Sequence, residues 1–192
     1  MERLTLLAVA LLLLGCATTS GPAAVVNRYL AATTLDEAAA VLAPDYRLWF
    51  GERKGDGLDR DAALGMLTWD FALHPRHRVD SLTVRGNEVI ARVHEDNDFS
   101  LLIGFPGWDA TSTYTVDATG RISSQLYVPK PGQPEWRPYL DAPLAWIGEH
   151  RPDVLPRIFP NGKLARSAEA AAEWVRVLRE WRAATGQPDP TR

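Results

Sequence analysis

The stretch AAVVNRYLAATTLDEAAAVLAPDYRLWFGERKGDGLDRDAAL, residues 23–64, carries the clearest succession of structural signals in this chain. Pro22 at an entry position and apolar residues at helical spacing predict a first helix over 22–33. Thr34 followed three residues later by Glu37 has the form of a capping box, and Pro44 would end the helix that it starts. The stretch therefore opens with two short helices in succession.

A strand and a third helix follow within the same stretch. DYRLWF, residues 45–50, alternates so that Tyr46, Leu48 and Phe50 share one face, which is typical of a strand. After a glycine-containing turn, Asp59 is placed to cap a helix over 60–74. That segment is apolar on more than one side, so we expect this helix to be largely buried.

The next fifty residues read as strands. Two hairpins are expected, pairing 78–84 with 88–98 and 111–116 with 121–128. Between them, SLLIGFPGWDA (100–110) is expected to be an apolar edge that leads into a Gly/Pro loop carrying Trp108. Helices followed by a run of antiparallel strands indicate an α+β fold.

A Pro-rich connector then leads to C-terminal helices. Ser167 is placed to cap a last helix with an apolar stripe that contains Trp174 and Trp181. Such a stripe usually docks on a core, so we expect the segment 130–192 to pack on the preceding domain.

The N-terminus has the features of an export signal. Residues 4–14 form an apolar run that is too short to span a membrane but suits a signal peptide. It ends in LLGC, with Cys16 the only cysteine of the chain. This resembles the lipobox of bacterial lipoproteins, which implies a signal peptide over 1–15, lipidation of Cys16 and a tether over 16–21. An ordinary secretory signal with an incidental cysteine is the alternative.

Composition narrows the function classes. A formal net charge of −3 carries no electrostatic footprint for nucleic acid. A single cysteine allows no internal disulfide and no cysteine-based metal site. No dinucleotide, P-loop or nucleophile-elbow motif occurs, so no cofactor is predicted.

The order of these elements resembles the nuclear transport factor 2-like superfamily, which includes SnoaL-like polyketide cyclases, scytalone dehydratases and ketosteroid isomerases. The resemblance covers residues 22–129 and rests on the quoted stretch and the later hairpins. It implies N-terminal helices packed on a curved antiparallel sheet that forms a conical pocket, with a C-terminal helical extension outside it. By strand alternation we expect the sheet's inward side chains to come from the following positions: Tyr46, Leu48, Phe50, Val89, Ala91, Val93, Glu95, Asn97, Ser112, Tyr114, Val116, Ile122, Ser124 and Leu126.

The resemblance also implies where an isomerase would hold its catalytic groups. Its helix tyrosine matches Tyr29, but its carboxylate base falls on Phe50 and its oxyanion-hole acid falls near Ser112. That mechanism would therefore need Glu95 to act as the base from another strand. A general acid/base role for Glu95 requires a desolvated carboxylate, whereas a strand-end carboxylate in water is the simpler interpretation.

Two histidine-containing motifs are given structural interpretations. In VHEDNDF (93–99), strand alternation puts His94 and Glu95 on opposite faces, so no metal site is predicted. HPRH (74–77) is expected to be an exposed basic turn at the end of a helix.

The leading hypothesis is a lipid-anchored protein of the bacterial cell envelope, on the periplasmic face of the outer membrane where there are two membranes. Its pocket, lined by Tyr29, Tyr46, Phe50, Trp69, Trp108 and Tyr114, would bind a small hydrophobic ligand or serve interaction without catalysis. The alternative is an isomerase, dehydratase or cyclase that uses Tyr29 and Glu95. A third is a structural role in which the C-terminal helices plug the pocket or meet a partner. The resemblance also implies a homodimer through the outer sheet face.

Overall fold

A computed structural model describes residues 21–192 of the chain. Cys16 and the expected signal peptide lie outside the described residues. Within 21–192, no helix combines the length and the apolar character needed to cross a membrane. The helices are α1 (Pro22–Leu30), α2 (Leu35–Val41), α3 (Arg60–Ala72), α4 (Asp98–Ile103), α5 (Asp141–His150), α6 (Leu155–Ile158) and α7 (Ala168–Ala184). The strands are β1 (Leu42–Phe50), β2 (Leu58–Asp59), β3 (Arg76–Arg85), β4 (Glu88–Asp96), β5 (Trp108–Val116) and β6 (Ile122–Pro129).

The predicted helix starts are confirmed. The Thr34 hydroxyl accepts from the Glu37 backbone N–H at 3.2 Å, and the Glu37 carboxylate accepts from the Thr34 N–H at 3.3 Å, which completes the capping box of α2. Asp59 caps α3 through the N–H of Ala62 at 2.9 Å, and Ser167 caps α7. Each cap satisfies N–H groups that the first turn of a helix leaves without a partner.

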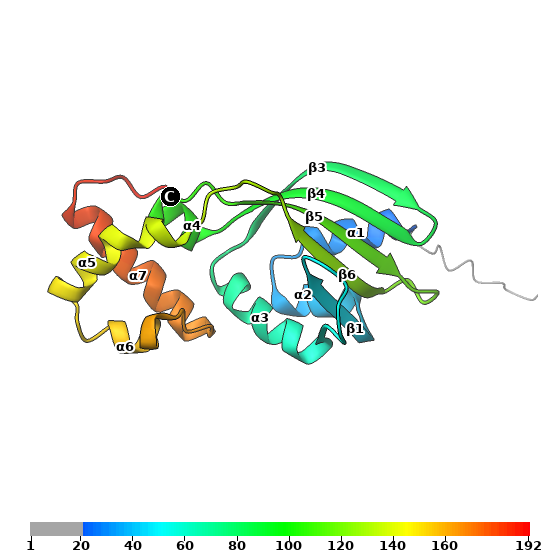
Figure 1. The fold of residues 1–192 in the computed structure, drawn as a ribbon, viewed down its shortest axis with the longest axis horizontal. Coiled ribbons are helices and arrows are strands. Elements are labelled where there is room, and N and C mark those ends of the chain that lie inside the picture. The colour runs from blue at the N-terminus through cyan, green and yellow to red at the C-terminus, as the bar shows by residue number, and fades with distance from the viewer. Residues whose placement is uncertain (1–20) are drawn as a thin grey trace, which may run out of the picture.

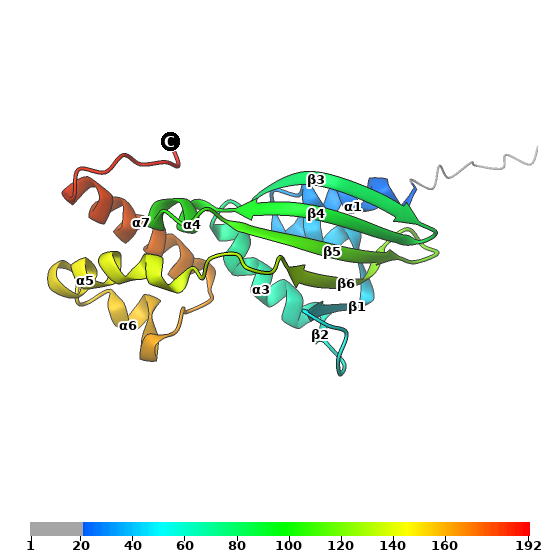
Figure 2. The ribbon, with the colours of Figure 1, turned by 45° about the horizontal axis from the view of Figure 1, so that its top comes forward.

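One curved sheet of six strands, in the order β2-β1-β6-β5-β4-β3, covers α1, α2 and α3 (Figure 1). The α+β cone architecture is thus as expected, with one difference. The sheet is mixed, because β6 returns alongside β1 in the parallel direction while all the other pairs are antiparallel. Figure 2 shows the strands running side by side over the helices.

Two bulges change which side chains face the helices. In β3 the register shifts so that Asp80 is an extra residue, and in β6 Ser123 is extra. One extra residue moves every later side chain to the other face. The expectation that Ser124 and Leu126 point inward is therefore wrong, and Gln125, which is 7% exposed, takes the inward position.

The segment after β4 is a helix and not the expected apolar edge. Asn97 caps α4, since its side chain accepts from the Ser100 N–H at 2.9 Å while the Ser100 hydroxyl accepts from the Asn97 N–H at 3.0 Å. Gly104 ends the helix with a left-handed φ of 78°, which glycine adopts without strain. A capping box built from Asn and Ser, and a helix of only six residues, made this element hard to predict from periodicity.

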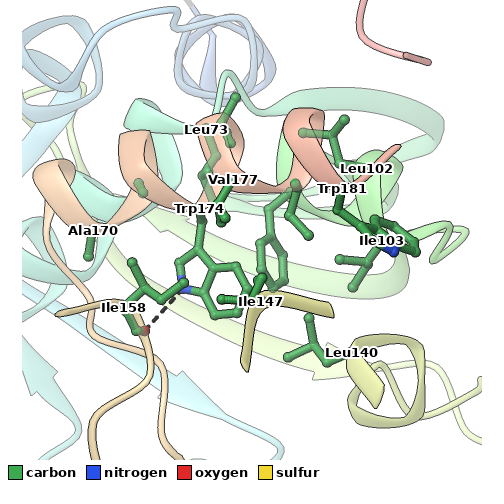
Figure 3. Close-up of a cluster of buried hydrophobic side chains, with 14 of the residues drawn as sticks. Leu73, Leu102, Ile103, Leu140, Ile147, Ile158, Ala170, Trp174, Val177 and Trp181 are labelled. Atoms are coloured by element: carbon green, nitrogen blue, oxygen red, sulfur yellow. Dashed lines mark hydrogen bonds between the residues drawn. The ribbon is translucent and has the colours of Figure 1, made fainter. Parts of the chain in front are cut away.

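The C-terminal helices form a second core at one end of the cone (Figure 1). They pack around α4 and the end of α3, and they leave the outer face of the sheet uncovered. Trp174 is fully buried at the centre, and its indole N–H donates to the carbonyl of Ile158 at 3.0 Å (Figure 3). The extension therefore lengthens the molecule and covers the end of the cone at which β4 ends and β5 begins.

Candidate functional site

A cavity of about 290 Å³ lies between the sheet, α1, α3 and the C-terminal segment. Aromatic and aliphatic side chains make most of its wall, and two carboxyls and one imidazole are among the polar groups that line it. Its lining consists of Tyr29, Leu30, Leu48, Phe50, Ala63, Met66, Leu67, Trp69, Asp70, Phe71, Pro75, His77, Val93, Glu95, Asn97, Phe99, Trp108, Ser112, Tyr114, Gln125, Tyr127, Trp136, Leu164 and Arg166. Apolar walls with a few convergent polar groups are typical of small-molecule sites.

Glu95 lies at the end of β4 and faces this cavity, on the same face of the strand as Val93. Its side chain is 23% exposed. In the sheet, Glu95 pairs with His77 of β3 on one side and with Trp108 of β5 on the other. Removal from bulk water, assisted by the charge of Asp96, raises the pKa of Glu95 to about 7. The solvated strand-end interpretation of Glu95 is therefore wrong, because the strand keeps its register as far as the cavity.

His77 lies on β3 directly opposite Glu95, so the expectation of an exposed turn at HPRH is wrong for this residue. Its Nδ1 is 3.1 Å from the carbonyl oxygen of Leu30 and must donate, because a carbonyl oxygen can only accept. Burial lowers the pKa of His77, which favours the neutral ring. The Nε2 atom of that tautomer is unprotonated and lies 3.8 Å from a carboxyl oxygen of Glu95.

Asp70 brings a second carboxyl into the cavity from α3. Burial, followed by the charge of Glu95, raises the pKa of Asp70 to about 7, while Arg166 and His77 act in the opposite direction. Sequence reasoning missed Asp70, although a signal for it exists. Ala63, Met66 and Asp70 follow helical spacing along one stripe, and an acid on an apolar stripe is a candidate for an interior role.

A chain of hydrogen bonds supports the tyrosines on the sheet side of the cavity. The Tyr46 hydroxyl donates to Oε1 of Gln125 at 2.8 Å, and Nε2 of Gln125 donates to the Ser112 hydroxyl at 3.2 Å and to the Tyr114 hydroxyl at 3.4 Å. The Tyr29 ring packs edge-on against Tyr114 with centroids 5.8 Å apart. Burial raises the pKa of Tyr29 well above its ordinary value, so its hydroxyl stays protonated.

The structure brings most of the expected pocket residues together. Trp69, Trp108 and Tyr114 line the cavity with Tyr29, and Phe50 stands at its margin with 50% exposure. Tyr46 does not reach the cavity. It is 1% exposed, and its hydroxyl is turned to Gln125 within the wall.

The remaining acidic and histidine residues of VHEDNDF are engaged elsewhere. His94 Nδ1 lies 2.8 Å from Asp109, and the Asp98 carboxylate contacts His74 and Arg76 at 2.8 Å and 2.7 Å. Across residues 21–192, no three His, Cys, Asp or Glu side chains are grouped so as to hold a metal ion.

The fold just described is shared with solved proteins of the nuclear transport factor 2-like cone type. The enzyme SalBIII, described as epoxide hydrolase/cyclase-like and acting in pyran ring formation in polyether salinomycin, is 12% identical with a TM-score of 0.50 over 58% of this chain and 92% of its own. IdmH from Streptomyces antibioticus, a proposed polyketide cyclase, is 18% identical with a TM-score of 0.49 over 63% and 99%. An NTF2-like protein of unknown function from Cytophaga hutchinsonii is 16% identical with a TM-score of 0.43 over 62% and 95%.

No protein-family profile and no curated protein matches the chain. At such identities the similarity defines the fold and leaves the activity to the site itself. The protein is thus an α+β cone protein with two carboxyls in its cavity and an added helical end.

Proposed function

We propose that the cavity binds a small, largely apolar molecule and that Glu95 and Asp70 exchange protons with it, as in an isomerase, dehydratase or cyclase. This proposal rests on one observation: the carboxyls of Glu95 and Asp70 and the neutral imidazole of His77 line the same largely apolar cavity. With pKa values of about 7, each carboxyl is partly protonated near neutral pH. One can then accept a proton while the other donates one.

The roles divide by position. Glu95 is assigned as the base, because its carboxyl faces the cavity from the sheet and the neutral His77 ring beside it, with Nε2 at 3.8 Å, offers an acceptor to the carboxyl once it is protonated. Asp70 approaches from the opposite wall and is the better acid, and the Tyr29 hydroxyl can donate to a ligand oxygen while remaining protonated. This arrangement replaces a base at Phe50, where the resemblance places the one used by ketosteroid isomerases.

A generic proton-abstraction probe tests this proposal without knowledge of the natural substrate. 5-Nitrobenzisoxazole is small and apolar. When a base removes its ring C–H proton, the N–O bond breaks and a coloured nitrophenolate is released. We expect wild-type protein to accelerate this elimination and Glu95→Gln to lower the rate about 100-fold, the usual size of a general-base contribution. Glu52→Gln is the matched control, since the Glu52 side chain is 74% exposed and does not line the cavity.

Ligand binding without turnover is the second candidate, and the phenylalanine at the position of the isomerase base favours it. The neutral fluorophore N-phenyl-1-naphthylamine separates the two. If this probe binds but wild-type protein catalyses the elimination no faster than Glu95→Gln protein, the cavity is a binding site and the catalytic proposal is refuted.

We also propose that the mature protein is anchored to a membrane of the bacterial envelope through lipid on Cys16. The motif LLGC supports this proposal, together with the unique cysteine. Cys16→Ala should move the protein from the membrane to the soluble fraction on cell fractionation. Unchanged fractionation would contradict the anchor.

Self-association through the outer sheet face is a further proposal. Ile90, Thr113 and Leu126 are in register across β4, β5 and β6 on that face, and none of them is fully buried. Sedimentation should show a dimer that Leu126→Glu converts to monomer. A monomeric wild-type protein would refute this proposal.

A further inference from the structure

A surface groove adjoins the cavity and carries a concentration of positive charge. It is lined by Glu135, Trp136, Arg137, Phe159, Gly162, Lys163, Leu164 and Arg166. Three of these residues, Trp136, Leu164 and Arg166, line the cavity as well. The groove therefore adjoins the cavity at these three side chains, and a ligand in the cavity lies next to the groove there.

The charges of the groove are unequal in number and in availability. Three cations face one acid, Glu135, in a chain whose formal net charge is −3. Arg137 is partly engaged, since it pairs with Asp141 at 3.3 Å and lies over the Phe159 ring at 5.2 Å. The side chains of Lys163 and Arg166 have no hydrogen-bond or ion-pair partner within residues 21–192, so their charges are available to a ligand.

We infer that the ligand is an amphiphile with a negatively charged group, whose apolar body fills the cavity while its anionic group binds Arg166 and Lys163 at the junction with the groove. This inference rests on the proposed function, because it assumes that the cavity is the ligand site. Arg166 is suited to carboxylate, sulfonate or phosphate oxygens, which its planar guanidinium can bind in pairs. The apolar wall supplies affinity without direction, and the cations set which end of the ligand points outward.

The electrostatics of Asp70 support this arrangement. The charge of Arg166 favours ionised Asp70. An anionic group bound to Arg166 would offset that charge, so a bound ligand would keep the Asp70 carboxyl protonated. The inferred ligand would thus help to prepare the acid that the proposed reaction needs.

Two probes that share one apolar skeleton test the inference on the full chain. 8-Anilino-1-naphthalenesulfonate carries a sulfonate, whereas N-phenyl-1-naphthylamine has the same aromatic system without it. Trp69, Trp108 and Trp136 line the cavity, so quenching of tryptophan fluorescence reports either probe when it binds. We expect the anionic probe to bind about fivefold more tightly than the neutral one, and this preference to shrink at high salt.

Arg166→Gln and Lys163→Gln should each weaken the anionic probe by about two- to fivefold and leave the neutral probe unchanged. Arg92→Gln is the control for net charge, because Arg92 is exposed on the outer face of β4. Equal affinities for the two probes, or variants that weaken both alike, would overturn the inference while the cavity remains a binding site. Failure of both probes to bind would refute cavity binding itself, and the inference with it.

Discussion

Replacement of Glu95 by glutamine should stabilise the protein at alkaline pH and have little effect at acidic pH. The folded-state pKa of Glu95 is about 7, against an ordinary value of 4.5, so the folded protein holds this proton more tightly than the unfolded chain. The contribution of the group to stability is therefore fully present below pH 4.5 and is lost as the pH rises through 7. Glutamine has nearly the same shape as glutamate but does not ionise, so the variant does not lose stability as the pH rises.

The magnitude follows from the same values. A rise from 4.5 to about 7 corresponds to an upper limit of about 3 kcal/mol, at about 1.4 kcal/mol for each pKa unit. The 23% exposure of the side chain to the cavity reduces this figure, because water that enters the cavity solvates the carboxylate. We therefore expect Glu95→Gln to raise the free energy of unfolding at pH 8 by about 2 kcal/mol more than at pH 4.5.

Urea unfolding at pH 4.5 and pH 8 measures this difference. Glu52→Gln serves as the control for the loss of one exposed carboxylate and should show almost no pH-dependent change. Because the charge of Glu95 raises the pKa of Asp70, the double variant Asp70→Asn/Glu95→Gln should gain less than the sum of the single variants. If Glu95→Gln gains no more stability at pH 8 than at pH 4.5, the carboxyl is solvated and the acid-pair reasoning fails.

Two further substitutions test the backbone beside the site and the added core. Gly107→Ala should destabilise the protein by more than about 2 kcal/mol in urea unfolding, since φ is +96° and a Cβ would meet the carbonyl oxygen of Glu95 at 2.5 Å. Gly104→Ala, at φ +78° with open space around it, should cost only about 1 kcal/mol, and equal losses would contradict the contact argument. Trp174→Phe should cost about 2 kcal/mol, because it removes one of the two hydrogen bonds to the Ile158 carbonyl, the other coming from the Ala165 N–H, and leaves buried space unfilled. Trp174→Ala should cost about 4 kcal/mol, and a loss below about 1 kcal/mol for this variant would show that the second core is loosely packed.

Local chemistry made much of the fold predictable from the sequence. Thr34 with Glu37, Asp59 and Ser167 mark helix starts through contacts of three residues or fewer, so no tertiary information is needed to place them. Glu95 was assigned to the inner face because β4 has unbroken alternation from Val89 onward. Where the determinants are local or strictly periodic, the prediction was confirmed.

Two inner side chains of the sheet were missed at points where a single extra residue changes the register. Strict alternation from the turn of the β3–β4 hairpin places Arg78 inward and His77 outward, and the extra residue Asp80 reverses this. The bulge at Ser123 likewise turns Gln125 inward and Leu126 outward. The position of a bulge depends on the curvature of the whole sheet, so it cannot be predicted from a short stretch of sequence. Of the polar side chains in the cavity, Glu95 was placed on the inner face from the sequence, whereas His77, expected in an exposed turn at a helix end, and Asp70 were not.

The contrast between two polar groups inside the cone bears on function. Gln125 has every close partner that its amide needs, with Tyr46 as donor and Ser112 as acceptor, as expected where polar groups serve only the structure. The side-chain carboxyls of Glu95 and Asp70 accept no hydrogen bond from another residue of the described chain, and the ionisation of both is disfavoured by burial. An amide at either position would serve folding better. Side chains that cost stability and face a cavity are expected where a ligand or a reaction uses them, and this cost is the physical argument for an active or binding site at this end of the cone.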